Sequence, residues 1–161
     1  MWEQALDGQL WIRIGFAIIC GGVVGVERQI RGKPVGIRTS IMICLSTTLF
    51  IYLATLVDQP NCLRVLGQLI TGVGFLGAGV IMNRGGLVTG MTSASVVWML
   101  AGIGAAIGFG YFGIAVMICA IALIVLVGVQ LLEGAFKELR QGIYEIRRTK
   151  KHHHNEGNDV Y

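Results

Sequence analysis

Charged residues are scarce in this sequence. Of its 161 residues, 14% are charged and 54% are hydrophobic, and the mean hydropathy is +0.70. So few polar side chains cannot coat a soluble globule of this size. The composition therefore excludes an ordinary soluble domain and predicts an integral membrane protein, for which the lipid bilayer acts as the solvent.

Acidic residues and histidines are missing from most of the chain. No Asp or Glu lies between Asp58 and Glu133, and the three histidines are His152, His153 and His154. An enzyme needs an acid–base pair, an activated nucleophile or a metal site that faces a cavity, and the spans offer no such set. We therefore expect no enzyme, no catalytic residues, no cofactor and no metal site. The role of the three histidines stays open.

Cysteine and proline are also rare. The four cysteines show no Cys-x-x-Cys spacing, and three of them (Cys20, Cys44 and Cys119) lie inside apolar segments, so we expect free thiols. Pro34 and Pro60 each fall between apolar segments. They mark loops, because proline lacks the backbone amide and disfavours helix in the preceding residue.

Long apolar segments are what the sequence does contain. A helix needs about 20 apolar residues to cross the roughly 30 Å hydrocarbon core of a bilayer. The pattern predicts an all-α membrane protein with about five transmembrane helices, over residues 10–26, 39–57, 65–82, 92–108 and 114–132. Residues 83–86 predict a turn before the fourth helix. That helix is short and rich in glycine, so its depth in the membrane stays open.

The distribution of basic residues predicts the orientation. Of 13 Lys and Arg residues, only Arg13 and Arg64 fall on one side of the membrane if five helices cross it. Basic loops stay in the cytoplasm. We therefore expect an N-terminus outside and a cytoplasmic C-terminus. The basic residues flank apolar segments instead of lining one soluble face, which argues against a nucleic-acid partner.

The end of the chain differs from the rest in composition. We expect a transmembrane domain over residues 1–132 and a basic cytoplasmic tail over residues 133–161. Apolar residues recur in the tail every three to four positions, at Phe136, Leu139, Ile143 and Ile146. This spacing fits a helix that lies on the anionic inner leaflet, or equally a solvated helical extension, before a disordered end.

Small residues recur at helical spacing. Gly67, Thr71, Gly74 and Ala78 form one stripe, which would let a neighbouring helix approach closely. We expect a compact bundle, and glycine replacements in the third span should reduce folding; a homo-oligomer stays open. Gly-x-Gly-x-x-Gly at residues 72–77 is an accidental match to the dinucleotide motif, because no acidic residue follows about 20 positions on. The glycines assigned to helix packing are Gly21, Gly25, Gly67, Gly72, Gly74, Gly77, Gly79, Gly104 and Gly108.

Glu27 is the only carboxylate near the predicted cytoplasmic ends of the first four spans. A negative charge at a helix C-terminus opposes the helix dipole, so Glu27 needs a cation, and Arg31 and Arg38 are within reach. One interpretation is a structural ion pair that holds the loop. The other is a recognition surface on the cytoplasmic side, although Thr92 and Ser93 also suit a helix start. Its candidate residues are Glu27, Arg28, Arg31, Arg38, Thr39, Asn83, Arg84, Thr92 and Ser93.

Four motifs resemble, in order and spacing, the membrane domain of the MgtC/SapB family. They are GVERQIR at 25–31, GIRT at 36–39, GVGFLGAGVIM at 72–82 and GMTSASVVW at 90–98, within a resemblance over residues 8–132. The last motif departs from the family, which usually has Leu followed by Thr-Thr-Ala-Ala. The chain also resembles a short form without the soluble C-terminal domain of longer members.

The resemblance implies a multi-pass protein of the bacterial inner membrane that is linked to magnesium homeostasis, to adaptation to low magnesium and, in pathogens, to virulence. One family member is described as restraining the F-type ATP synthase. The chain is therefore expected to regulate a membrane-protein partner, and the alternative is a transporter or channel for magnesium or another cation. Mg²⁺ is normally met by oxygen ligands that include carboxylates, and the last three spans have none. The lack of carboxylates in these spans favours regulation over transport, and whether the chain binds Mg²⁺ stays open.

Overall fold

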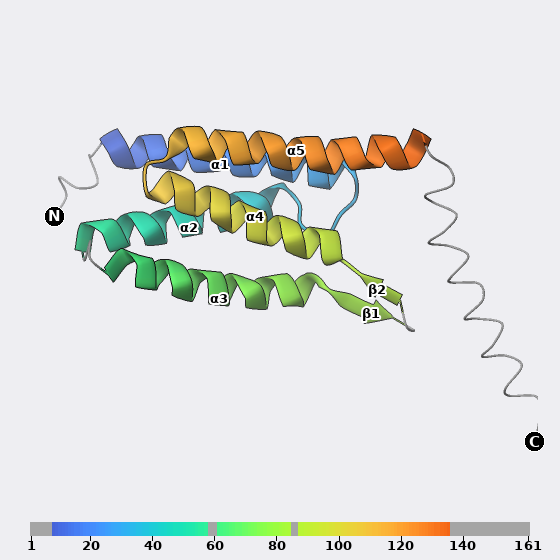
Figure 1. The fold of residues 1–161 in the computed structure, drawn as a ribbon, viewed down its shortest axis with the longest axis horizontal. Coiled ribbons are helices and arrows are strands. Elements are labelled where there is room, and N and C mark those ends of the chain that lie inside the picture. Colours follow the sequence, from blue (N-terminus) through green and yellow to red (C-terminus); the bar gives the residue numbers. More distant parts are fainter. Residues whose placement is uncertain (1–7, 58–60, 85–86, 136–161) are drawn as a thin grey trace, which may run out of the picture. The chain divides into compact units, whose positions relative to one another are not determined.

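The computed structural model describes residues 8–57, 61–84 and 87–135 (Figure 1). These residues form five helices: α1 (Gly8–Ile30), α2 (Ile37–Val57), α3 (Cys62–Val80), α4 (Met91–Gly108) and α5 (Phe112–Ala135). All five are long and apolar enough to cross a membrane. The prediction of an all-α protein with five transmembrane helices is confirmed.

The helix ends differ from the predicted bounds in one way that matters. Helix α1 continues past residue 26 to Ile30, so that Glu27 and Arg28 lie in its last turn. The apolar run marks only the part of a helix that suits the hydrocarbon core, whereas the helix itself can continue into the interface. Glu27 and Arg31 thereby come within one helical turn of each other.

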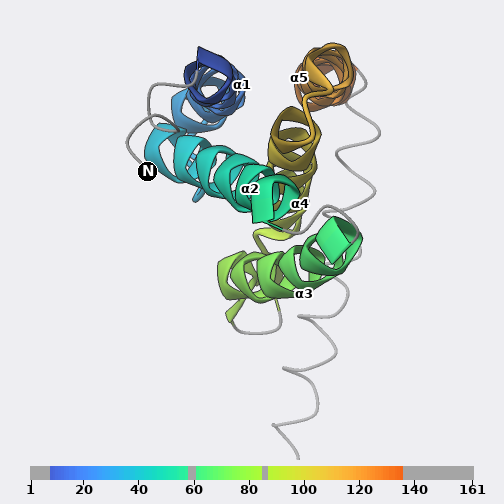
Figure 2. The ribbon, with the colours of Figure 1, turned by 90° about the vertical axis from the view of Figure 1, so that its left-hand side faces the viewer.

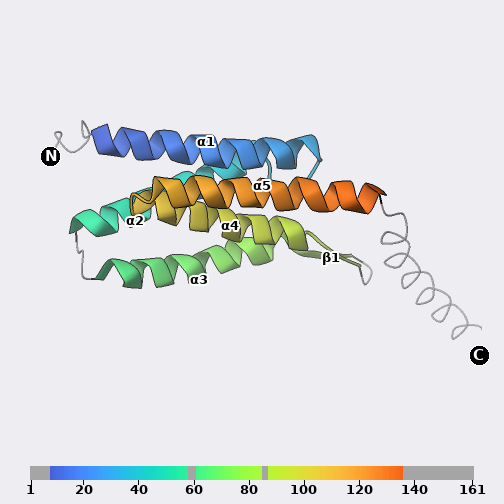
Figure 3. The ribbon, with the colours of Figure 1, turned by 45° about the horizontal axis from the view of Figure 1, so that its top comes forward.

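The predicted turn at residues 83–86 overlaps a strand of a short hairpin: residues 83 and 84 belong to that strand, and residues 85 and 86 lie outside the described residues. Helix α3 ends at Val80, and strands β1 (Met82–Arg84) and β2 (Leu87–Thr89) pair antiparallel, with Met82 opposite Thr89. Figure 3 shows β1 continuing from the end of α3. Gly90 follows with a φ of 91°, and a Cβ there would overlap the Val80 carbonyl oxygen. The return of the chain into α4 therefore requires glycine at this position.

Successive helices run in alternating directions. The loop after α1 and the hairpin before α4 lie at one end, and the link between α4 and α5 lies at the other (Figure 1). Arg28, Arg31, Lys33 and Arg38 share the first end, and Arg13 is near the second. Most basic residues of the described ranges therefore gather at one end, and the assignment of that end to the cytoplasm stays a prediction.

Glycine contacts hold α2 between α1 and α4. Cβ atoms built on Gly21 and Gly25 would lie 2.9 Å from the Ile41 Cα and 2.6 Å from the Ile37 Cα, both on α2. From α4, a Cβ on Gly108 would lie 2.6 Å from the Ile51 Cβ. Such distances leave room only for hydrogen, so the helix backbones pack directly on one another. Figure 2 shows α2 and α4 in the middle, with α3 at the edge.

The glycines of α3 behave differently from the prediction. Cβ atoms on Gly67, Gly72, Gly74 and Gly79 would meet nothing within 4 Å, and only Gly77 faces a neighbour, at 3.9 Å from the Ala94 Cβ. Val73 and Gly77 are the buried residues of α3. Gly67 and Gly72 therefore contact no neighbouring helix, and Gly74 and Ala78 line an open groove beside α4. The expectation that glycine replacements in the third span reduce folding stays a prediction.

Two compact units divide the chain, residues 1–123 and 124–161. The described part of the second unit, residues 124–135, is the last part of α5. The predicted domain boundary at residue 132 stays a prediction. The predicted amphipathic segment of the tail and the three histidines lie outside the described residues. All four cysteines are described and are free thiols, as expected.

Candidate functional site

A buried arginine lies at the centre of the site. Arg28, in the last turn of α1, is 1% exposed, and its Nη2 donates a hydrogen bond of 3.0 Å to the Ser93 hydroxyl in the first turn of α4. Ser93 is itself buried. This bond joins residues 65 positions apart, and it links the end of α1 to the start of α4.

Glu27 supplies the negative charge beside this arginine. Its carboxylate lies 2.5 Å from the Arg31 Nε and 3.8 Å from the Arg28 Nη1, and its side chain is 9% exposed. Neither oxygen accepts a hydrogen bond of good geometry from the described residues. Glu27 is therefore held mainly by charge attraction to Arg31, and it compensates the charge of Arg28 only at longer range.

The loop after α1 is folded back on the helix end. Gly32 has a φ of 61°, and the Lys33 amide donates to the Arg28 carbonyl oxygen at 3.0 Å. The Gln29 Oε1 accepts a hydrogen bond of 3.1 Å from the Ile37 amide at the start of α2. These bonds fix the loop and bring Lys33 to the same side as Arg28.

A small polar pocket lies where these elements meet. Its volume is about 190 Å³, and it opens between the end of α1, the following loop, the hairpin and the start of α4. None of the described residues that line it is acidic. The lining residues are Arg28, Lys33, Pro34, Val80, Met82, Thr89, Gly90, Thr92 and Ser93.

The structure brings only part of the predicted cluster together. Glu27, Arg28, Arg31, Thr92 and Ser93 lie at or beside the pocket.

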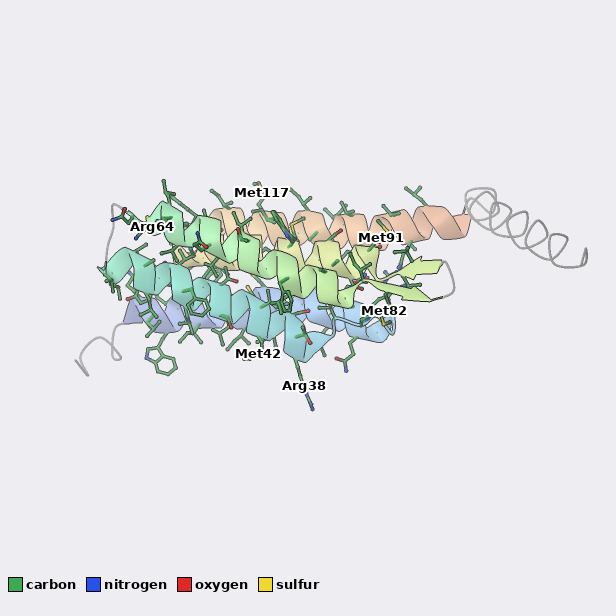
Figure 4. The ribbon with its side chains drawn as sticks, turned by 90° about the horizontal axis from the view of Figure 1, so that it is seen from below. Arg38, Met42, Arg64, Met82, Met91 and Met117 are labelled. Carbon is green, nitrogen blue, oxygen red and sulfur yellow. The ribbon has the colours of Figure 1, made fainter. Side chains whose placement is uncertain are left out.

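Two predicted members lie elsewhere. Arg38 is exposed and projects away from the helices (Figure 4), and Thr39 lines a separate groove of about 550 Å³ between α2 and α3. Both face outward at the start of α2, because the small residues Gly25 and Ser40 occupy the contact with α1. The side chains of Asn83 and Arg84 lie outside the described residues.

Lys33, Thr89 and Gly90 also line the pocket, but the sequence did not assign them to a site. Lys33 entered only the charge count, and its position directly before Pro34 is the signal that could have marked it as fixed in a loop. Thr89 and Gly90 come to the pocket through the hairpin, which the sequence did not predict.

Arg13 has a role that the sequence also did not reveal. Its Nη1 donates hydrogen bonds of 2.8 Å to the carbonyl oxygens of Ile107 and Gly108 at the end of α4. The guanidinium also lies 4.8 Å from the ring centroid of Tyr52 and 5.8 Å from that of Phe112. Arg13 therefore caps the negative end of the α4 dipole.

Glu27→Gln is expected to destabilise the folded protein, because it removes the ion pair between Glu27 and Arg31. The substitution removes the only described carboxylate beside two guanidinium groups, one of them buried, so the folded state should lose about 2–3 kcal/mol. Unfolding of the purified protein in mixed detergent–SDS micelles measures this. Arg38→Ala is the control, and it should stay within about 0.5 kcal/mol of wild type because Arg38 is exposed. Equal stability of Glu27→Gln and wild type would contradict a structural role for the pair.

The comparisons with known proteins agree on one family. The model of the MgtC family matches residues 14–135 of the chain. Protein SapB of Bacillus subtilis is 32% identical over 120 residues, which cover 66% of this chain and 50% of SapB. Protein MgtC of Salmonella typhimurium (strain LT2) is 40% identical over 98 residues, which cover 60% of this chain and 42% of that protein.

A further relative carries a name that refers to transport. The Escherichia coli (strain K12) protein named "Putative magnesium transporter YhiD" is 36% identical over 130 residues, which cover 75% of this chain and 60% of that protein. No solved structure matches the chain. The chain spans about half the length of the curated relatives it matches.

Proposed function

Because the chain belongs to the MgtC family, we propose that it acts in magnesium homeostasis and adaptation to low magnesium by regulating another complex of the bacterial inner membrane, such as the F-type ATP synthase. The chain is a multi-pass membrane protein with magnesium-related relatives. The proposed role is a non-enzymatic one, in which a helix of the partner contacts α3.

The observation that carries this proposal is the stripe of small residues on α3, defined as Gly67, Thr71, Gly74 and Ala78, of which Gly74 and Ala78 line an open groove of about 790 Å³ beside α4. Gly67 and Gly74 have no atom within 4 Å of an added Cβ, whereas the glycine pairs of α1 and α4 press on α2. Only 11% of the α3 span is buried, against 50% of the α4 span. Small residues at this spacing allow another helix to approach closely in a membrane. The stripe therefore suits a helix of a partner protein.

The charges of the candidate site support regulation over cation transport. Glu27 is held by Arg31, and the adjacent pocket is lined by Arg28 and Lys33. A divalent cation is repelled by such a cluster and finds no carboxylate among the described residues of the pocket wall. The name of the Escherichia coli relative supports the alternative, a transporter or channel for magnesium or another cation.

Mg²⁺ flux into proteoliposomes separates these two functions. We expect no saturable flux above that of empty vesicles when the folded protein is present in both orientations. Saturable flux that Glu27→Gln abolishes would establish the transporter and overturn the regulatory proposal.

The variant Gly67→Leu tests the partner contact directly. Its side chain enters open space in this chain, so folding should be kept, but it blocks close approach of a second helix. Crosslinking to subunits of the F-type ATP synthase is measured through Thr71→Cys, with and without Gly67→Leu. We expect Gly67→Leu to reduce this crosslinking at least tenfold and to cause a growth defect in low magnesium. Gly15→Leu is the matched control, because a Cβ on Gly15 in α1 also meets nothing within 4 Å.

Two outcomes would count against the α3 contact. One is normal growth and crosslinking of the Gly67→Leu protein at wild-type abundance. The other is crosslinking of α3 only to a second copy of this chain, which would show that the stripe forms a homo-oligomer.

A further inference from the structure

We propose that the pocket between the end of α1 and the start of α4 binds a phosphate-type oxyanion, held by Arg28, Lys33 and the first backbone amides of α4. The inference is independent of the partner contact on α3, because it rests on different residues. It concerns the pocket of about 190 Å³ at the basic end of the chain.

The first observation is an incompletely satisfied guanidinium. Arg28 lines the pocket and is 1% exposed, and its Nη2 is used by Ser93. Its Nε is buried and has no hydrogen-bond partner. A buried donor without an acceptor is costly, and more so on a charged group. An anion in the pocket would supply the missing acceptor.

The second observation is the balance of charge on the pocket wall. Arg28 and Lys33 both line it, and within residues 8–57, 61–84 and 87–135 no acidic residue does. Glu27 lies outside the lining, 2.5 Å from the Arg31 Nε but 3.8 Å from the Arg28 Nη1. The charge of Arg28 is thus only partly compensated, and the exposed Lys33 has no ion pair with a carboxylate among the described residues. The pocket wall therefore attracts a negative ligand.

The third observation is the start of α4, an 18-residue helix. Gly90 is its N-cap residue and provides no side-chain hydrogen bond. The Ala94 amide is the first to find a backbone acceptor, the Gly90 carbonyl oxygen at 2.9 Å. The amides of residues 91–93 precede that bond, and they point out of the helix start together with its positive dipole. Amides in this arrangement bind phosphate groups.

The size of the pocket limits the ligand. Pockets for drug-sized ligands measure roughly 300–1,000 Å³, so about 190 Å³ suits one phosphate group and excludes a whole nucleotide. The hydroxyl of Thr92, on the same wall, is a further donor. Free phosphate and the headgroup phosphate of a lipid share this chemistry, and the pocket lies at the helix ends where either could reach it.

The test is isothermal titration calorimetry of the purified full chain in a phosphate-free maltoside detergent at constant ionic strength. One arm uses inorganic phosphate, and the other uses dihexanoyl-phosphatidylglycerol below its micelle concentration. We expect saturable binding in at least one arm. Lys33→Gln, at an exposed position that tolerates change, should raise the dissociation constant about tenfold, the effect of losing one charge-assisted contact.

Matched variants distinguish a site from general surface charge. Arg38→Gln removes the same charge at the same end of the chain but outside the pocket (Figure 4), and it should change the dissociation constant less than twofold. Arg28→Lys keeps the charge but loses the planar guanidinium group and its several donors. If the variant still unfolds cooperatively, it should weaken binding by about tenfold or more. Glu27→Gln, which removes the competing carboxylate, should strengthen binding.

The outcomes are decisive in either direction. Saturation by phosphate alone supports the site with a free anion as its ligand, and saturation by the lipid alone supports it with a headgroup as its ligand. No saturation in either arm would overturn the proposal. So would equal weakening by Arg38→Gln and Lys33→Gln, because binding would then reflect surface charge and not the pocket.

Discussion

Gly104→Ala is expected to destabilise the folded protein by about 3 kcal/mol. A Cβ at this position would overlap the Cys44 carbonyl oxygen and lie 2.9 Å from the Thr47 Cβ. The obstructing carbonyl belongs to the backbone of α2 and cannot rotate away, so α4 would have to move off α2. That movement also weakens the contact between the Thr48 hydroxyl and the Gly104 carbonyl oxygen, now 3.0 Å. Unfolding in mixed detergent–SDS micelles, followed by tryptophan fluorescence, measures the loss.

Gly102→Ala is the control for this prediction. It makes the same substitution two residues away on the same helix, and its Cβ would meet nothing within 4 Å. Because alanine is the better helix former, stability should stay equal or rise by up to about 1 kcal/mol. If Gly104→Ala and Gly102→Ala had the same stability, the close packing of α4 on α2 would be wrong.

Arg13→Leu is expected to lose about 2–4 kcal/mol of stability. The substitution removes the 2.8 Å hydrogen bond from each of the Ile107 and Gly108 carbonyl oxygens, and within the described residues only the Ile107 oxygen keeps a further donor, the Gly110 amide at 2.9 Å. It also removes the cation from the Tyr52 and Phe112 rings. A hydropathy argument gives the opposite sign, since leucine is favoured in a membrane-spanning segment and arginine is not. The same unfolding titration therefore separates the two explanations of this residue.

Arg13→Lys and Arg64→Leu complete the set. Lysine keeps a charge at the end of α4 but lacks the planar donor group, so an intermediate loss is expected. Arg64, on α3, is exposed (Figure 4 labels it), and its replacement should change stability by less than about 0.5 kcal/mol. A more stable Arg13→Leu protein would show that the arginine is a topology signal and not a helix cap.

Particular residues show where prediction from the sequence succeeds. The five spans follow from local hydropathy, because roughly 20 apolar residues in succession have few alternatives to a membrane helix. The four family motifs lie within residues 25–98, and the family model matches residues 14–135. Glu27 and Arg31 could also be paired in advance, since they lie four residues apart, provided that α1 continues to Ile30.

Other residues show where prediction from the sequence fails. Glu27 and Arg38 were grouped because both are near the same loop, but Arg38 faces away from α1. The stripe on α3 and the glycine pair of α4 have the same small-residue spacing, and only the latter meets α2. Spacing defines a face of a helix but does not define which helix, if any, lies against it.

The sequence by itself determined that this is a membrane protein of five helices, which end of the bundle is basic, and to which family the chain belongs. Each of these follows from sums or patterns over neighbouring residues. The tertiary structure alone decided that Arg28 meets Ser93, that Arg13 caps α4, and that Lys33 and the start of α4 share a pocket. These groups lie far apart in sequence, and their distances depend on how closely the backbones of α1, α2 and α4 approach at their glycines.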